Sequence, residues 1–200
     1  MKIRLMLVAT AVAATLSVST LAQSKKQQKR YLAAQEVPQG DATKENAPAF
    51  FPAYASVTMA DGTSKPISKV CAGERIKCYY EGQLTTTHVK EVATAALTSI
   101  TELYLRPVDE VTASRQSWPM VPALLLEATP NHPVQTLAGR KLVSELKKGD
   151  VLLRYEAATG LLSAWKVGLI QAKARPVATA CTLRTEMGSF LVENLVVLDR

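Results

Sequence analysis

The feature that most constrains the fold of this chain is an internal repeat with a constant offset between its two copies. The segment ISKVCAGERIKCY, residues 67–79, aligns with VSELKKGDVLLRY, residues 143–155. Each copy has two apolar residues three positions apart, then a glycine followed by an acidic residue, then a strand-like run. Because glycine readily adopts the positive φ of a tight turn, Gly73 and Gly149 mark the same corner in both copies. The repeat therefore predicts a duplicated β unit with pseudo-twofold symmetry.

Short runs of β-branched and aromatic residues, each bounded by Gly, Pro, Asn or Asp, fill the chain from residue 49 onward. Their spacing is typical of an all-β domain. The predicted strands are residues 56–59, 75–80, 88–94, 99–105, 123–128, 150–155, 165–170, 179–185 and 189–198. The proline-containing stretch 106–122 interrupts this rhythm and is predicted to be a loop inserted between two strands.

The segment 1–22 has the pattern of a secretory signal peptide. Lys2 and Arg4 precede an apolar stretch, and the small residues that a signal peptidase requires place the cleavage after Ala22. The apolar stretch is short for a membrane span and is interrupted by hydroxyl side chains, so no transmembrane anchor is expected after cleavage. The sequence therefore predicts a secreted or periplasmic protein.

Residues 23–48 lack hydrophobic periodicity and are predicted to be a flexible lead-in to a β domain at 49–200. The basic residues of the lead-in are Lys25, Lys26, Lys29 and Arg30. Such a run is more often a solvated tail, and its alternative role is a weak contact with an anionic surface. The run gives no indication of specific nucleic-acid binding, and the sequence does not identify a partner.

Cys71, Cys78 and Cys181 are the only cysteines, so in an oxidising compartment at least one thiol has no partner within the chain. At most one intramolecular disulfide is expected, and the sequence does not select its pair. The spacing of Cys71 and Cys78 fits no zinc motif, and the two histidines are too far apart in the sequence to complete one. No metal and no other cofactor is expected.

Three blocks of the sequence resemble the hedgehog/intein (Hint) family. They are VTMADGTSKPISKVCAGERIKCY (57–79), LLLEATPNHPVQTLAGRKLVSELKKGDVLL (124–153) and SFLVENLVVLD (189–199). The middle block is the most specific, because TPNHPV, a glycine turn and the LxxGD pattern follow one another in the order of the family. The resemblance implies an all-β fold, a flattened horseshoe of two related halves, with autoproteolytic peptide-bond rearrangement as its chemistry.

In this family a Cys, Ser or Thr at the first position of the domain attacks the carbonyl group of the preceding residue. A Thr-x-x-His motif orients and polarises that peptide bond, and its histidine supplies the proton for departure of the amide. In inteins a final Asn, helped by a preceding His, then cyclises to cut the other junction. By this resemblance Thr129 and His132 match the Thr-x-x-His pair, and Asp199 stands at the position of the terminal Asn.

The nucleophile of the family pattern is replaced in this chain. Counting back from Met59 places Phe50 at the nucleophile position, and residues 47–55 contain no Cys, Ser or Thr. The Gly-Thr pair that the family has just downstream is replaced by Tyr54 and Ala55. Because a phenyl ring cannot attack a carbonyl group, the sequence predicts that the acyl shift at this junction is lost.

The C-terminal pair of the family pattern is replaced as well. Leu198 and Asp199 stand where inteins have His-Asn. Leucine cannot transfer protons, and an ionised aspartate has no amide nitrogen with which to form a succinimide. Leu198 and Phe50 are both apolar and are expected to fill the former cleft. The sequence therefore predicts a catalytically degenerate Hint domain that acts as a structural or binding module.

Two other interpretations of His132 remain open. With Thr129 it would assist an acyl shift by an unrecognised nucleophile, such as one of the three cysteines, which would make the chain an active self-processing domain. Alternatively, His132 is a structural residue whose ring is bound to the backbone of a β corner. His88 has no motif around it and is predicted to be a surface residue.

Overall fold

The computed structural model describes residues 49–108 and 124–199, which contain twelve strands and two short 3-10 helices. The strands are β1 (Phe51–Pro52), β2 (Ser56–Thr58), β3 (Ser64–Pro66), β4 (Arg75–Tyr80), β5 (Gln83–Pro107), β6 (Leu124–Ala128), β7 (Pro133–Thr136), β8 (Gly139–Leu142), β9 (Val151–Glu156), β10 (Leu161–Thr185), β11 (Ser189–Val192) and β12 (Leu195–Leu198). The 3-10 helices are η1 (Ile67–Lys69) and η2 (Val143–Glu145). The predicted signal peptide, the lead-in with its basic residues and most of the predicted loop lie outside the described residues.

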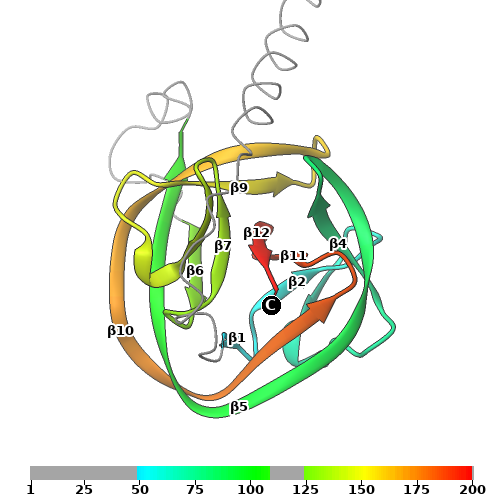
Figure 1. The fold of residues 1–200 in the computed structure, drawn as a ribbon, viewed down its shortest axis with the longest axis horizontal. Coiled ribbons are helices and arrows are strands. Elements are labelled where there is room, and N and C mark those ends of the chain that lie inside the picture. The colour runs from blue at the N-terminus through cyan, green and yellow to red at the C-terminus, as the bar shows by residue number, and fades with distance from the viewer. Residues whose placement is uncertain (1–48, 109–123, 200) are drawn as a thin grey trace, which may run out of the picture. The chain divides into compact units, whose positions relative to one another are not determined.

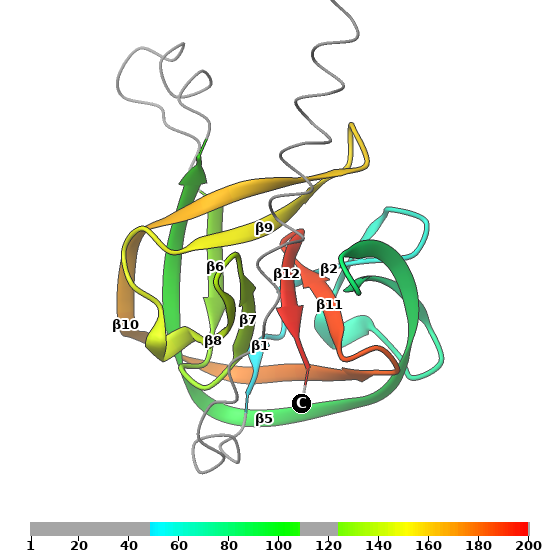
Figure 2. The same cartoon turned by 45° about the horizontal axis from the view of Figure 1, so that its top comes forward.

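Two strands of 25 residues each, β5 and β10, run side by side and curve around the other strands (Figures 1 and 2). They pair antiparallel from Trp165 opposite Pro107 to Thr185 opposite Val89. The sequence predicted two separate strands within each of these segments, and that division is wrong. It placed a break in the middle of each segment, where the structure continues both strands and interrupts their pairing only by a register shift between Gln171 and Arg175.

Each long strand contains one residue in the left-handed region of backbone space. Leu97 in β5 has a φ of 47°, and Lys173 in β10 has a φ of 51°. Such a residue is uncommon in a strand and changes the direction of the chain locally. Leu97 and Lys173 are separated by the same offset as Gly73 and Gly149, so the two long strands repeat each other as the shorter elements do.

The predicted repeat is confirmed element by element. Helix η1 and strand β4 precede helix η2 and strand β9 by the offset that relates the two copies in the sequence. In each copy a lysine binds the acidic residue of the glycine corner. Lys65 Nζ lies 2.6 Å from Glu74 Oε1, and Lys141 Nζ lies 2.8 Å from Asp150 Oδ1. The duplicated β unit therefore keeps its ion pair as well as its backbone.

The glycine corner has the same geometry in both copies. Gly73 has a φ of 85° and Gly149 has a φ of 98°, which is the conformation that the sequence predicted for these glycines. The N–H of Gly73 donates to the carbonyl of Val89 at 2.7 Å, and the N–H of Gly149 donates to that of Val167 at 2.8 Å. Each corner is therefore bound to the long strand of its own half.

The largest buried cluster lies among the inner strands and the inward-facing side chains of β5 and β10. Its fully buried members include Phe51, Ile76, Leu103, Leu126, Leu152, Leu183 and Phe190. A second cluster joins the matched tyrosines, Tyr79 and Tyr155, to Leu191 and Val196 of the β11–β12 hairpin. Because these tyrosines come from equivalent strands, the hairpin packs against both halves.

All strand pairs among the described residues are antiparallel, which confirms the predicted all-β class with two related halves. The predicted strand 189–198 is instead a hairpin, because Glu193 and Asn194 adopt φ values of 51° and 63° and turn the chain. Strands β1, β3, β7 and β8 have two to four residues each and were not predicted. Runs this short have too few residues to show alternation.

Candidate active site

The peptide bond between Ala49 and Phe50 is held by Thr129. The N–H of Phe50 donates to Thr129 Oγ1 at 2.9 Å, and the N–H of Thr129 donates to the carbonyl oxygen of Phe50 at 2.9 Å. Ala49 and Thr129 are both buried. The residue that the sequence placed at the nucleophile position therefore lies directly against the threonine of the Thr-x-x-His motif.

His132 lies at the end of a tight turn that begins at Thr129. Its N–H donates to the carbonyl of Thr129 at 3.0 Å, and only 1% of its surface is exposed. The ring Nδ1 lies 3.0 Å from the carbonyl oxygen of Pro133. Because a carbonyl oxygen only accepts hydrogen bonds, this contact requires the proton of a neutral ring to be on Nδ1. The backbone thus fixes both the orientation and the tautomer of the histidine.

Two phenylalanine rings pack against the histidine ring. The Phe51 centroid lies 4.1 Å from that of His132 at an interplanar angle of 47°, and the Phe190 centroid lies 6.4 Å away at 78°. Both phenylalanines are fully buried. The buried imidazole is therefore enclosed in part by aromatic rings.

The side chains packed against His132 are not the two that were expected to fill the former cleft. Phe50 was expected to fill the former cleft together with Leu198, but Phe50 packs in a separate cluster with Ile100 and Val177. Leu198 is only partly buried. The ring that covers the histidine belongs to Phe51, because neighbouring residues of an extended chain point to opposite sides.

Asp199 lies near the same end of the sheet as the histidine, but its carboxylate has other partners. Val197 of β12 lies opposite Val134 of β7, so the residues beyond these positions, Asp199 and His132, are brought to one end of the strand pair. Asp199 Oδ2 accepts hydrogen bonds from the N–H of Thr185 and from its hydroxyl group, the latter at 2.7 Å. The carboxylate therefore accepts hydrogen bonds that join the end of β12 to the end of β10.

None of the three cysteines is joined to another in a disulfide. Cys71 is exposed and lies on the turn before β4. Burial raises the pKa of Cys78 to about 11 and also raises the pKa of Cys181. Cys181 is the cysteine that lies opposite Phe51 in the β10–β1 pair, but its raised pKa disfavours the thiolate needed for attack.

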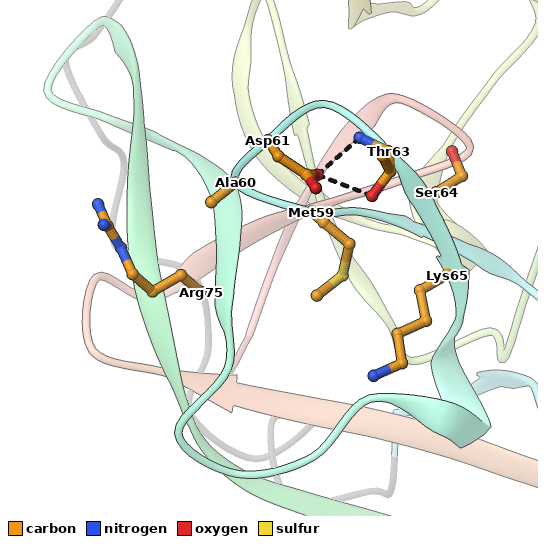
Figure 3. Close-up of a pocket in the computed structure, with 7 residues that line it drawn as sticks. All are labelled: Met59, Ala60, Asp61, Thr63, Ser64, Lys65 and Arg75. Carbon is orange, nitrogen blue, oxygen red and sulfur yellow. Dashed lines mark hydrogen bonds between the residues drawn. The ribbon is translucent and has the colours of Figure 1, made fainter.

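A shallow hollow lies under the hairpin that joins β2 and β3 (Figure 3). Asp61 accepts hydrogen bonds from the N–H and the hydroxyl of Thr63 at 2.9 Å and 2.7 Å. Lys65 binds Glu74, and Arg75 donates to a threonine hydroxyl of β5 at 2.7 Å. Figure 3 shows the Lys65 and Arg75 side chains pointing in different directions. The hollow therefore lacks the convergent polar groups of a binding or catalytic site.

The structure places the predicted site residues in two groups. Phe50, Thr129 and His132 lie together around one peptide bond and one turn, while Asp199 binds Thr185. His88 is half exposed beside Glu186, as predicted for a surface residue. The sequence analysis missed the packing of Phe51 and Phe190 against His132. Both residues are far from the histidine along the chain, and the block 189–199 assigned no role to Phe190.

Within the described ranges 49–108 and 124–199, no group of three or more His, Cys, Asp or Glu side chains could hold a metal ion. Over the same residues, no helix has the length and apolar character needed to cross a membrane.

Comparison with solved structures gives several similar folds that cover about three quarters of this chain. The DnaB intein from Synechocystis sp. PCC 6803 matches with a TM-score of 0.62 and 16% identity, over 76% of this chain and 99% of the intein. The bacterial intein-like domain from Clostridium thermocellum matches with a TM-score of 0.57 and 16% identity, over 77% of this chain and all of that domain. The gp41-1 intein matches with a TM-score of 0.56 and 15% identity, over 76% and 100% of the two chains. No protein-family model and no curated protein matches this sequence.

Proposed function

We propose that this chain, which has the Hint fold of inteins and bacterial intein-like domains, is an exported Hint protein without autoproteolytic or splicing activity. In this proposal the domain acts as a structural or binding module. The observation that carries the proposal is the hydrogen-bonded pair of Phe50 and Thr129. The pair supports the register in which Phe50, with its phenyl group, stands at the position of attack.

The acyl shift of Hint domains needs an oxygen or sulfur atom that attacks the carbonyl carbon of the preceding residue. In this chain that carbon belongs to Ala49, and the side chain that follows is the phenyl group of Phe50. Thr129 still binds the amide N–H of the bond that would break, at 2.9 Å. The part of the site that orients the peptide is therefore retained, while the part that attacks it is absent.

The second junction also lacks the group that would react. Asn cyclisation requires a side-chain amide nitrogen, and the carboxylate of Asp199 has none. Two hydrogen bonds from Thr185 hold this carboxylate in place. The neighbouring Leu198 cannot move a proton, so cyclisation lacks both its nucleophile and its acid.

The alternative is an active self-processing domain in which Thr129 and His132 assist an unrecognised nucleophile. The observation that favours it is the position of Cys181, which lies opposite Phe51 in the strand next to the site. Against it stand the raised pKa of this thiol and its burial in the core. The degenerate domain is therefore the better supported function.

The proposal is tested by the intact mass of the protein purified from the exported fraction. One species that begins at Gln23 and ends at Arg200 is expected, with or without hydroxylamine or excess thiol. A cut between Ala47 and Ser56 would contradict the proposal, because an acyl shift would act there. A chain that still carries the segment 1–22 would contradict export. It would not bear on the proposed loss of autoproteolytic activity.

A restoration experiment tests the register directly. Phe50→Cys supplies the nucleophile, and Ala55→Thr with Tyr54→Gly supplies the turn of the family pattern. Thiol-induced cleavage after Ala49 is expected in this triple variant, and His132→Ala in the same background should abolish it. A folded triple variant that stays intact in excess thiol would mean that the register is wrong, and cleavage that survives His132→Ala would exclude a role for the histidine.

A further inference from the structure

A cluster of polar side chains on the outer face of the sheet joins the turn after Phe51 to three strands. Its members, here called the Tyr54 clamp, are Tyr54, Glu102, Tyr104, Glu127 and Arg175. They come from the turn between β1 and β2 and from strands β5, β6 and β10. Tyr54 stands where the family pattern has a glycine, but none of these side chains has a chemical role in the acyl shift described above, so their role is a separate question.

Tyr54 is the centre of the clamp. Its hydroxyl group donates to Glu127 Oε2 at 2.6 Å, and the guanidinium of Arg175 donates both to the Tyr54 oxygen and to Glu127 Oε1. The same guanidinium lies over the Tyr54 ring, 5.8 Å from its centroid. Burial and the hydrogen bond to Glu127 raise the pKa of Tyr54, so the phenol keeps the proton that it donates.

A second carboxylate completes the clamp on the β5 side. Glu102 lies opposite Glu127 in the β5–β6 pair, with one oxygen 3.5 Å from Arg175 Nε and the other accepting from the Tyr104 hydroxyl at 2.9 Å. Only 13% and 10% of the two glutamate side chains are exposed. Carboxylates this far removed from water need hydrogen-bond partners, and Arg175 and the two tyrosines supply them.

The clamp lies next to the residues that enclose the histidine. Tyr54 follows Phe51 by three positions, and the ring of Phe51 covers His132 at 4.1 Å. Glu127 precedes Thr129 by two positions on the same strand end. One hydrogen-bonded group therefore ties the segment that carries the aromatic cover to the strand that leads into the histidine turn.

We infer that the Tyr54 clamp is a strap that keeps the Phe51 ring over His132 and closes the histidine to reactants from solvent. The inference rests on the proposed function, since a site that no longer catalyses autoproteolysis can remain closed. Releasing the strap opens the segment around Phe51 locally, while the β5–β10 pairing keeps the sheet folded. His132 then reacts with reagents that the closed form excludes.

The test uses chemical modification of the two histidines with diethyl pyrocarbonate, followed by peptide mass spectrometry. His88 is half exposed and serves as the internal standard. Tyr54→Phe removes the hydroxyl group that joins the strap to Glu127, and Arg175→Met removes the guanidinium. In both variants the rate at His132 is expected to rise about tenfold relative to His88, since each loses a hydrogen bond to a charged group.

Tyr104→Phe is the matched control, because it removes a hydroxyl group of the same cluster that does not touch the turn after Phe51. Its rate at His132 should stay close to that of the wild type. Equal rates in the wild type, Tyr54→Phe and Arg175→Met would overturn the inference, and so would an equal increase in Tyr104→Phe.

Low concentrations of urea separate local opening from general loss of stability. A local opening exposes little surface, so the faster modification of His132 in Tyr54→Phe should be nearly independent of urea. A steep urea dependence that follows global unfolding would overturn the strap. The intact mass of the same samples tests the proposed function separately, because a cleaved chain would contradict the loss of activity without changing the meaning of the modification rates.

Discussion

The turn at Pro52–Ala55 and the turn at Thr129–His132 have the same backbone hydrogen bonds and different side chains. In each turn the N–H of the fourth residue donates to the carbonyl of the first, at 2.9 Å and 3.0 Å. The first residue of the following 3-10 helix then donates to the fourth residue of the turn, at 2.8 Å and 2.9 Å. Ala55 therefore occupies the position in one half that His132 occupies in the other.

This difference shows that the two halves of the duplicated fold contribute different groups to the candidate site. The second half contributes the polar groups, because its turn presents the Thr129 hydroxyl and the His132 ring. The first half contributes the peptide bond that Thr129 holds and the Phe51 ring that covers the histidine. The backbone is common to both halves, so the character of the site depends on a few side chains that the copies do not share.

The largest expected effect on stability comes from replacing Phe51 by the residue at the matched position of the second half. The matched position in the second half is Ala128, and both residues are fully buried. Phe51→Ala removes the aromatic cover of His132 and leaves a cavity, which should lower the free energy of unfolding by about 3–5 kcal/mol. Urea denaturation measures this loss, with Phe51→Leu as the control that keeps most of the volume. A loss near zero would mean that the ring is not part of the core.

A moderate effect, equal in both halves, is expected at the glycine corners. A Cβ atom added at Gly73 or at Gly149 meets no atom within 4 Å, so the cost arises from the left-handed backbone alone. Gly73→Ala and Gly149→Ala should each lower the free energy of unfolding by about 1–2 kcal/mol. Paired denaturation curves compare the two variants. Clearly unequal losses would show that the two corners are not equivalent.

The smallest effect is expected from the matched ion pairs. Lys65→Met and Lys141→Met should each cost less than about 1 kcal/mol, because both pairs are partly exposed. The cost should be larger for Lys141, whose partner Asp150 is 18% exposed, than for Lys65, whose partner Glu74 is 32% exposed. Equal or reversed costs in a urea denaturation series would contradict this order.

The Lys65 pair also predicts a dependence on pH. The hydrogen bond from Lys65, followed by that from the Cys71 N–H, lowers the pKa of Glu74 below its ordinary value of 4.5. A lowered pKa in the folded state stabilises the protein above the ordinary pKa, and the stabilisation is lost as the pH falls through the folded value. The difference between wild type and Lys65→Met should therefore be full at neutral pH and should shrink in acid. A difference that grows in acid would contradict the assignment.

The repeat made much of the fold predictable from the sequence. Matching residues 67–79 with 143–155 located both glycine corners and both strands that follow them, because the same local pattern occurs twice. The continuity of β5 and β10 was not predictable. The sequence suggested a break in each of these segments. The chain instead continues through Leu97 and Lys173, which adopt a backbone conformation that is rare for their residue types and that the sequence does not indicate.

The sequence pointed to the polar residues of the candidate site and not to the apolar residues around them. The motif pointed to Thr129 and His132, and counting along the chain pointed to Phe50, which the structure places against Thr129. The covering rings of Phe51 and Phe190 depend on which face of each strand is turned inward, and no periodicity in such short strands shows this. The Tyr54 clamp joins residues 73 and 121 positions apart, and no local pattern connects them.

The pairing of the two long strands has a consequence for how the chain folds. Phe51 lies opposite Cys181, and Val89 lies opposite Thr185, so the first half completes its core with β10, a strand of the second half. Contacts between residues so distant in sequence require large loops to close before any stabilisation is gained, which slows folding. Neither repeat is therefore expected to be stable alone, and refolding should be slow and concerted, with both halves forming together.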